Sequence, residues 1–185
     1  MAMRCRRAYI ACSDAIMIVC EAVAGMFQSE ALQTLAVAAL GALCLFAMAA
    51  IVLFDAAVRL IPRRLCWMLA ASGAGWQFCR FGFCGMAAGA FWAAVFSSLA
   101  ALFAIISCFV AKTDERPLGG GDVRCMVALS LATGSAAPIG FAACFVAAAL
   151  WSGQARIRKR LLPKEPFAFA PFLAIWLVAG FLVLT

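Results

Sequence analysis

Long apolar segments separated by short polar ones run through almost the whole chain. The apolar segments cover residues 8–27, 33–54, 65–78, 85–110, 122–133, 139–151 and 172–184. The segment 33–54 has about the 20 residues that a membrane-spanning helix requires. We find no internal repeat and no soluble linker between the segments. The pattern predicts an all-α polytopic membrane protein with about six to seven transmembrane helices.

The first apolar segment, residues 8–27, has two interpretations. It carries Asp14 and Glu21, and an Ala-Val-Ala triplet near its end resembles a signal-peptide cleavage site. Its uninterrupted apolar core is short for a signal peptide, so we expect an uncleaved first helix. We therefore divide the chain into residues 1–32, a basic amino-terminal segment with this helix, and residues 33–185, a membrane-embedded domain.

Composition supports the membrane class and narrows the chemistry. Of the 185 residues, 68% are hydrophobic and only 12% are charged, and the mean hydropathy is +1.07. The absence of histidine excludes Ser-His triads and His-based zinc sites. All three lysines lie in polar loops, which argues against a buried Ser-Lys dyad. Any hydrolytic chemistry must therefore come from carboxylates, and no metal or cofactor is expected.

The ten cysteines do not indicate a metal site. None forms a Cys-x-x-Cys pair, and most lie within apolar segments, where cysteine acts as a small hydrophobic residue. Whether Cys79 and Cys84 are bridged stays open.

The basic residues predict the orientation. With a cytoplasmic amino terminus and alternating spans, 14 of the 15 lysines and arginines fall on the cytoplasmic side and only Arg80 falls outside. This distribution follows the positive-inside rule. The net charge of +7 is then explained by topology and by anionic lipid as a partner, so a nucleic-acid partner is not needed.

The same orientation brings two aspartates to one side of the membrane. Asp55 follows the segment 33–54, and Asp122 opens the segment 122–133. Both are therefore expected at the cytoplasmic boundary. The remaining acids of the polar loops are interpreted as solvated loop charges: Asp114, Glu115 and Glu165.

Two carboxyl groups held close together in a low-dielectric site share one proton. The ionised member can then act as a base on water while the protonated member donates to a peptide carbonyl, as in aspartic peptidases. Asp122 lies at a helix amino terminus and Asp55 near a carboxyl terminus, so the helix dipoles predict that the resting proton is mostly on Asp55. The alternative for Asp122 is structural, because aspartate after a glycine-rich turn is a common helix N-cap.

These residues also resemble a known family. Asp55 with Ile61-Pro62, and Gly119, Gly120 and Gly121 before Asp122, look like the two motifs of type IV prepilin peptidases, the Gly-x-Gly-Asp membrane aspartic proteases. The Pro-Phe-rich stretch at residues 166–173 resembles the segment before that family's last span, although it has two extra residues between its prolines.

The resemblance implies a function and a set of site residues. It implies an endopeptidase of the bacterial-type cytoplasmic (inner) membrane that cleaves basic leaders from prepilin or pseudopilin-like proteins at the cytoplasmic face. Asp55 and Asp122 become the catalytic pair, and Gly119, Gly120 and Gly121, together with Ile61 and Pro62, shape the loop that admits the substrate. The chain lacks the zinc-binding cysteine pairs of the larger members, so no methyltransferase activity is expected.

Two other functions remain open at this point. A non-catalytic assembly component of a pilus or secretion system would not depend on either aspartate. A small proton- or cation-coupled transporter would use acids near the middle of the membrane. Asp14 and Glu21 are compatible with such a transporter, whereas Asp55 and Asp122 lie at a boundary.

Overall fold

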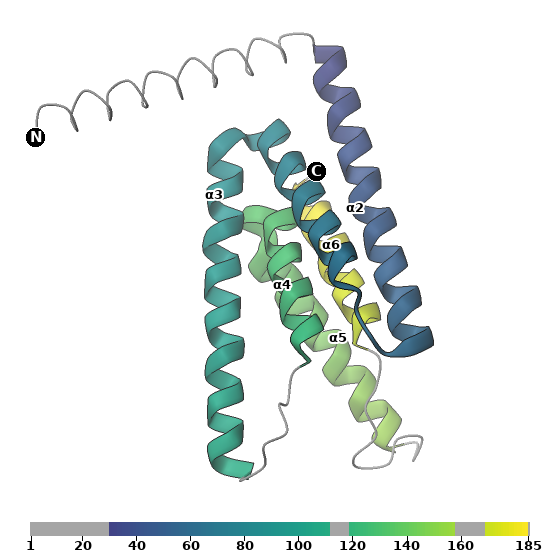
Figure 1. Cartoon of the computed structure of the whole chain (residues 1–185), viewed down its shortest axis with the longest axis vertical. Coiled ribbons are helices and arrows are strands. Elements are labelled where there is room, and N and C mark those ends of the chain that lie inside the picture. The colour runs from purple at the N-terminus through teal and green to yellow at the C-terminus, as the bar shows by residue number, and fades with distance from the viewer. Residues whose placement is uncertain (1–29, 112–118, 158–168, 185) are drawn as a thin grey trace, which may run out of the picture. The chain divides into compact units, whose positions relative to one another are not determined.

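The computed structural model describes residues 30–111, 119–157 and 169–184, and every element in these ranges is helical (Figure 1). The elements are α2 (Glu30–Val58), α3 (Arg63–Ala111), α4 (Gly120–Thr133), the short 3-10 helix η1 (Gly134–Ala136), α5 (Ala137–Ile157) and α6 (Ala170–Leu184). The predicted all-α class is confirmed for these ranges. The helix predicted at residues 8–27 lies outside them.

Contacts along the chain define two compact units, residues 1–38 and residues 39–185. The second unit contains both Asp55 and Asp122, and the site described below lies entirely within it. The predicted division of the chain after residue 32 falls inside α2, which runs from Glu30 to Val58. It stays a prediction.

Three helical stretches in the described part of the chain are long and apolar enough to cross a membrane. They are Glu30–Val58, Arg63–Ile106 and Gly120–Gln154, and α6 is a shorter apolar helix. Large apolar side chains on these helices are exposed, for example Leu53 at 70% and Phe83 at 73%. Such extensive apolar surface is typical of a protein that contacts lipid or a partner, and it supports the membrane class.

The segments predicted at residues 65–78 and 85–110 are the two arms of α3, which turns at Gly82 (Figure 1). Gly82 has φ 63° and ψ −153°, a conformation that is essentially restricted to glycine. No atom lies near the position that a Cβ would take there. The glycine is therefore needed for the backbone conformation rather than for close packing.

A second turn joins α4 to α5 and depends on Gly134. Its φ is 52°, and a Cβ at this position would lie 2.7 Å from the side-chain amide of Gln77. Gln77 is buried, and its Nε2 donates a hydrogen bond of 2.9 Å to the carbonyl oxygen of Ala132. That carbonyl lies in the last turn of α4, where it has no partner in its own helix. Gln77 therefore ties the end of α4 to α3.

This turn is shorter than the sequence predicts. The predicted apolar segments 122–133 and 139–151 leave residues 134–138 for the turn, but η1 ends at Ala136 and α5 begins at Ala137. Pro138 thus lies in the first turn of α5, where its missing N–H breaks no helical hydrogen bond.

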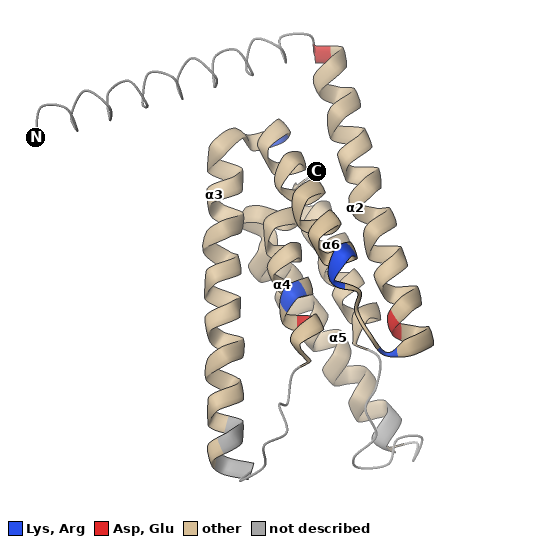
Figure 2. Ribbon diagram, in the orientation of Figure 1, with Lys and Arg blue, Asp and Glu red and all other residues tan. Residues whose placement is uncertain are grey.

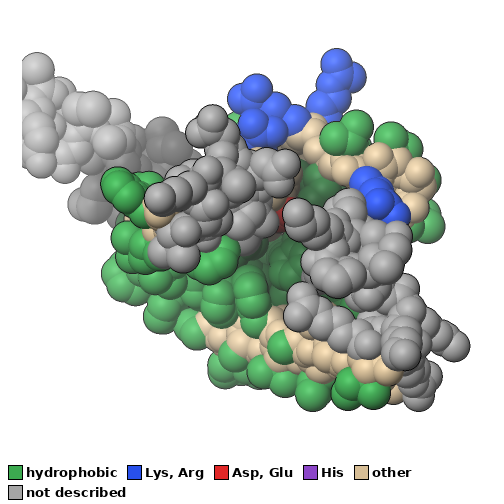
Figure 3. Space-filling view, turned by 90° about the horizontal axis from the view of Figure 1, so that it is seen from below, with side chains coloured by type: hydrophobic (Ala, Val, Ile, Leu, Met, Phe, Trp, Pro, Cys, Tyr) green, Lys and Arg blue, Asp and Glu red, His purple; other side chains and the backbone are tan. Residues whose placement is uncertain are grey.

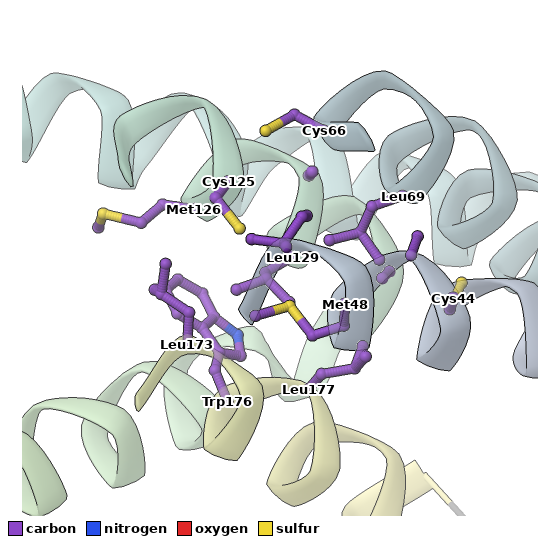
Figure 4. Packing of buried hydrophobic residues seen from close by; sticks show 14 of the residues in the cluster. Cys44, Met48, Cys66, Leu69, Cys125, Met126, Leu129, Leu173, Trp176 and Leu177 are labelled. Carbon is purple, nitrogen blue, oxygen red and sulfur yellow. The ribbon is translucent and has the colours of Figure 1, made fainter. Parts of the chain in front are cut away.

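The hydrophobic core of the second unit draws side chains from α2, α3, α4, α5 and α6, and Figure 4 shows part of it. Trp176 is fully buried, and its Nε1 donates to Thr133 Oγ1 at 3.2 Å. Phe96 and Phe141 pack edge-on against the Trp176 ring, each with 5.3 Å between centroids. The core residues labelled in Figure 4 are Cys44, Met48, Cys66, Leu69, Cys125, Met126, Leu129, Leu173, Trp176 and Leu177.

Candidate active site: two aspartates in one cleft

Asp55 lies in the last turn of α2 and is almost fully buried, with 6% of its surface exposed. Its Oδ2 accepts a hydrogen bond of 3.0 Å from the backbone N–H of Ala170, the first residue of α6. A helix leaves its first amides without partners inside the helix. The Asp55 carboxylate therefore takes the role of an N-cap side chain that is supplied by a different helix.

The first turn of α6 shows why the Ala170 amide needs this partner. The carbonyl oxygen of Phe169 accepts hydrogen bonds from the amides of Phe172 and Leu173, at 3.0 and 3.3 Å. Pro171 has no N–H to donate. The amide of Ala170 thus remains for a partner outside the helix, and Asp55 provides it.

Asp122 is the third residue of α4 and lies in its first turn. The N-cap of α4 is Gly119, with φ −64° and ψ 137° and no side-chain capping bond. The structural alternative from the sequence, in which Asp122 is itself the N-cap, is therefore wrong. The Asp122 carboxyl is hydrogen-bonded to the backbone of Gly119, and the Asp122 amide donates to the Gly119 carbonyl at 3.0 Å. An acidic third residue that reaches back to the N-cap is half of a capping box.

The two aspartates line a single cleft of about 370 Å³. They lie toward the same end of the second unit (Figure 2), close enough for the charge of Asp55 to act on Asp122. Seen from this end, a small acidic area is set back in the surface and arginine side chains lie farther out along the edge (Figure 3). The residues that line the cleft are Asp55, Arg59, Leu60, Ile61, Gly119, Gly120, Gly121, Asp122 and Arg124.

Both carboxyl groups thus lie at the amino terminus of a helix. The sequence placed only Asp122 there and for this reason assigned the resting proton to Asp55. The amide of Ala170 reaches the Asp55 carboxyl from the start of α6, so a helix amino terminus faces each of the two residues and the helix dipoles do not distinguish them. The sequence-based reason for placing the proton on Asp55 is therefore lost.

The glycines before Asp122 have different surroundings. A Cβ on Gly121 would lie 3.0 Å from the Cβ of Ile61, whereas a Cβ on Gly120 would meet no atom within 4 Å. Gly121 therefore allows the start of α4 to approach the segment between α2 and α3. Gly120 is exposed and leaves this wall of the cleft open.

The other predicted site residue, Pro62, does not line the cleft. Its carbonyl oxygen accepts hydrogen bonds from the amides of Leu65 and Cys66, at 3.1 and 3.4 Å, so Pro62 starts the first turn of α3. Pro62 thus has a structural role next to Ile61, which does line the cleft.

Three contributors to the site were missed in the sequence. Arg59 and Arg124 line the cleft although the sequence used them only to assign topology. The sequence could have indicated Arg124, because it lies only two residues after Asp122 and so must be near the site. Arg59 has φ 56°, a left-handed conformation that no local pattern indicated. The third contributor is the backbone amide of Ala170. This residue belongs to the Pro-Phe-rich stretch at residues 166–173, to which the sequence assigned no role.

Of the other acids, only Glu30 belongs to the described residues, and it does not line the cleft. Glu30 lies in the first turn of α2, while Asp14, Glu21, Asp114, Glu115 and Glu165 lie outside the described residues. In the part of the chain that the structure describes, no group of three potential metal ligands comes together. Cys79 and Cys84 are not joined by a disulfide.

The site therefore offers two carboxyl groups, a space for water and substrate between them, and two nearby cations. This arrangement can perform general acid and base catalysis on a carbonyl group. Comparison of the chain with protein-family models, with curated proteins and with solved structures gave no match. The assignment of function therefore depends on the geometry of the site and on the motifs in the sequence.

Proposed function

We propose that the protein is a membrane aspartic endopeptidase that removes basic leaders from prepilin or pseudopilin-like proteins at the cytoplasmic face of a bacterial-type inner membrane. One observation carries the proposal. Asp55 and Asp122, which belong to helices far apart in the sequence, line the same cleft and interact electrostatically. The motif resemblance described above supplies the substrate class.

The chemistry needs only the two carboxyl groups and one water molecule. The ionised aspartate takes a proton from water as the water oxygen attacks the peptide carbonyl, while the protonated aspartate donates its proton to the carbonyl oxygen. Collapse of the tetrahedral adduct breaks the C–N bond. The leaving amine takes the proton that the base accepted, and a hydroxyl group of the adduct returns a proton to the aspartate that had donated one as the new carboxyl group forms. Because the pair shares one proton before and after the reaction, it is ready for the next cycle.

The membrane topology that we propose has six to seven helices and a cytoplasmic amino terminus. It is supported by the three long apolar stretches, by the reversals at Gly82 and Gly134, and by the basic residues assigned to one side. Under this topology the cleft lies where lipid meets cytosol. A leader with basic residues would remain in water there while the apolar part of the substrate stays in the bilayer.

The direct test is cleavage of a co-expressed prepilin, with mature and precursor forms separated by gel electrophoresis. The wild-type chain is expected to convert the precursor, whereas chains without either aspartate are not. The Discussion gives the variants and their controls.

Replacing Gly121 by alanine is expected to reduce cleavage by roughly tenfold. The added Cβ meets Ile61 at 3.0 Å, so the start of α4 must shift by a few tenths of an ångström, and a 1 Å misplacement at an active site costs up to about 100-fold. Gly120→Ala is the matched control, because it changes the same loop without a new contact. Initial rates on one prepilin measure both variants, and equal rates for the two would contradict the close approach to Ile61.

Replacing Ala170 by proline is expected to slow cleavage. The change removes the N–H that binds the Asp55 carboxylate, while proline is well suited to the first position of a helix. Without this hydrogen bond the Asp55 carboxyl is no longer held in place, so initial rates on one prepilin should fall by roughly tenfold, as expected for a slightly misplaced catalytic group. Ala170→Gly keeps the N–H and serves as the control. Equal rates for the two variants would show that the N–H of Ala170 does not position Asp55.

A further inference from the structure

A groove between α3 and α4 takes no part in the proposed catalysis. It has a volume of about 200 Å³ and runs along one face of each helix, because its lining residues recur at intervals of three, four and seven positions. Over seven residues each helix rises about 10 Å, so the groove follows the two helices for roughly two turns. The residues that define it are Arg63, Trp67 and Ala70 on α3 and Arg124, Val127 and Leu131 on α4.

The two ends of the groove differ in charge. Arg63 is the first residue of α3 and Arg124 lies near the start of α4, so both cations lie at the same end (Figure 2). Both side chains are exposed, and among the described residues no acid lines the groove. From this end the groove continues between apolar walls formed by Trp67, Val127 and Leu131. Its natural ligand therefore has an anionic head and an apolar tail.

We propose that this groove binds one anionic phospholipid, with its phosphate between Arg63 and Arg124 and an acyl chain along the apolar wall. The proposal depends on the membrane location given under the proposed function but not on catalysis. Arginine guanidinium groups bind phosphate through paired hydrogen bonds. Exposed tryptophan beside arginine is also typical of the level where headgroups meet acyl chains, and Trp67 is 64% exposed.

The charge of the groove favours a lipid over a helix of a protein partner. A single phosphate can meet Arg63 and Arg124 together, whereas an apolar transmembrane helix offers no group that matches them. A flexible acyl chain is narrower and can follow the groove along its length. A transmembrane peptide is therefore the alternative occupant that the experiment must separate.

The test compares two neighbouring arginines of the same helix. Arg63 lines the groove, whereas Arg64, the next residue, is equally exposed but does not line it. The purified full chain in neutral detergent is titrated with phosphatidylglycerol, and bound lipid is counted by native mass spectrometry. Since one arginine at an anionic surface contributes about 1 kcal/mol, Arg63→Gln should lower the affinity about fivefold, while Arg64→Gln should leave it near the wild-type value. Arg124 is not used because it also lines the catalytic cleft.

Several results would overturn the proposal. Equal loss in Arg63→Gln and Arg64→Gln would show general attraction between charges, without a site. Equal binding of phosphatidylcholine with the same acyl chains would show that the groove does not recognise the charge of the headgroup. Competition by inorganic phosphate at millimolar concentration would identify a site for a free anion. Displacement of the lipid by a prepilin transmembrane peptide would assign the groove to substrate. Because the readout is bound lipid, these outcomes are independent of whether the chain cleaves prepilin.

Discussion

Asp55→Asn and Asp122→Asn are each expected to lower prepilin cleavage by roughly 100- to 10,000-fold, the range that a positioned general acid or base contributes. Asparagine has nearly the shape of aspartate but can neither share the proton nor take one from water. The two residues act as one unit, so the double variant should be no slower than the worse single variant. Initial rates on a purified prepilin, with the precursor and mature forms separated on gels, measure the effect.

Folding of these variants can be separated from their catalysis. In Asp55→Asn the side-chain amide oxygen can still accept the hydrogen bond from Ala170, so this variant should keep α6 in place and unfold near the wild-type temperature. Glu30→Gln is the control for charge, because Glu30 is an exposed acid in the first turn of the same helix. Cleavage that survives both aspartate substitutions would end the proposed mechanism and would favour a non-catalytic role in pilus or secretion assembly.

The second large effect is expected at Gly73, where α3 and α4 are closest. A Cβ on Gly73 would lie 2.5 Å from the Cβ and 2.6 Å from the Cα of Ala132. The Cα of Ala132 belongs to the backbone of α4, so the steric clash can be relieved only if α3 and α4 move apart. Gly73→Val should therefore lower the free energy of unfolding by about 3 kcal/mol, at the upper end of the usual cost of overpacking. It should also reduce cleavage, because α4 carries Asp122.

Unfolding can be followed by the reaction of a thiol-specific dye with the buried cysteines Cys44, Cys125 and Cys144 as the temperature rises. Gly153→Ala is the matched control, since Gly153 is also helical but a Cβ there would meet no atom within 4 Å. This control should stabilise the protein by up to about 1 kcal/mol, because alanine is the better helix former. An unchanged unfolding temperature for Gly73→Val would show that α3 and α4 do not pack as described.

Local sequence patterns were sufficient for the helices. The apolar segments at residues 33–54, 85–110 and 172–184 correspond to α2, the second arm of α3 and α6, with ends that differ by a few residues. The helices could be recognised because length and hydrophobicity act along one stretch of chain. The length of the turn at residues 134–136 was overestimated by the sequence pattern. Pro138 was taken as part of the turn, but proline is accepted in the first turn of a helix as readily as in a loop.

The contents of the cleft could be predicted only in part. Asp55, Asp122 and the glycines carry a recognisable spacing, and the basic residues predict that both acids lie on one side of a membrane. The positive-inside rule already accounted for Arg59 and Arg124 as cytoplasmic charges. For this reason they were not considered as neighbours of the aspartates. The left-handed conformation of Arg59 gave no signal, because arginine rarely adopts it and no glycine marks the position.

By itself, the sequence determined the class of the protein, the extent of its apolar helices and the presence of two acids at the ends of such helices, because each of these depends on neighbouring residues alone. The tertiary structure decided which groups meet those acids. The amide of Ala170 reaches Asp55 because α6 begins where α2 ends, and Gly121 meets Ile61 because the start of α4 packs against the segment between α2 and α3. Such contacts join segments that are far apart in the chain, so they arise only when the helices pack and cannot be derived from any local pattern.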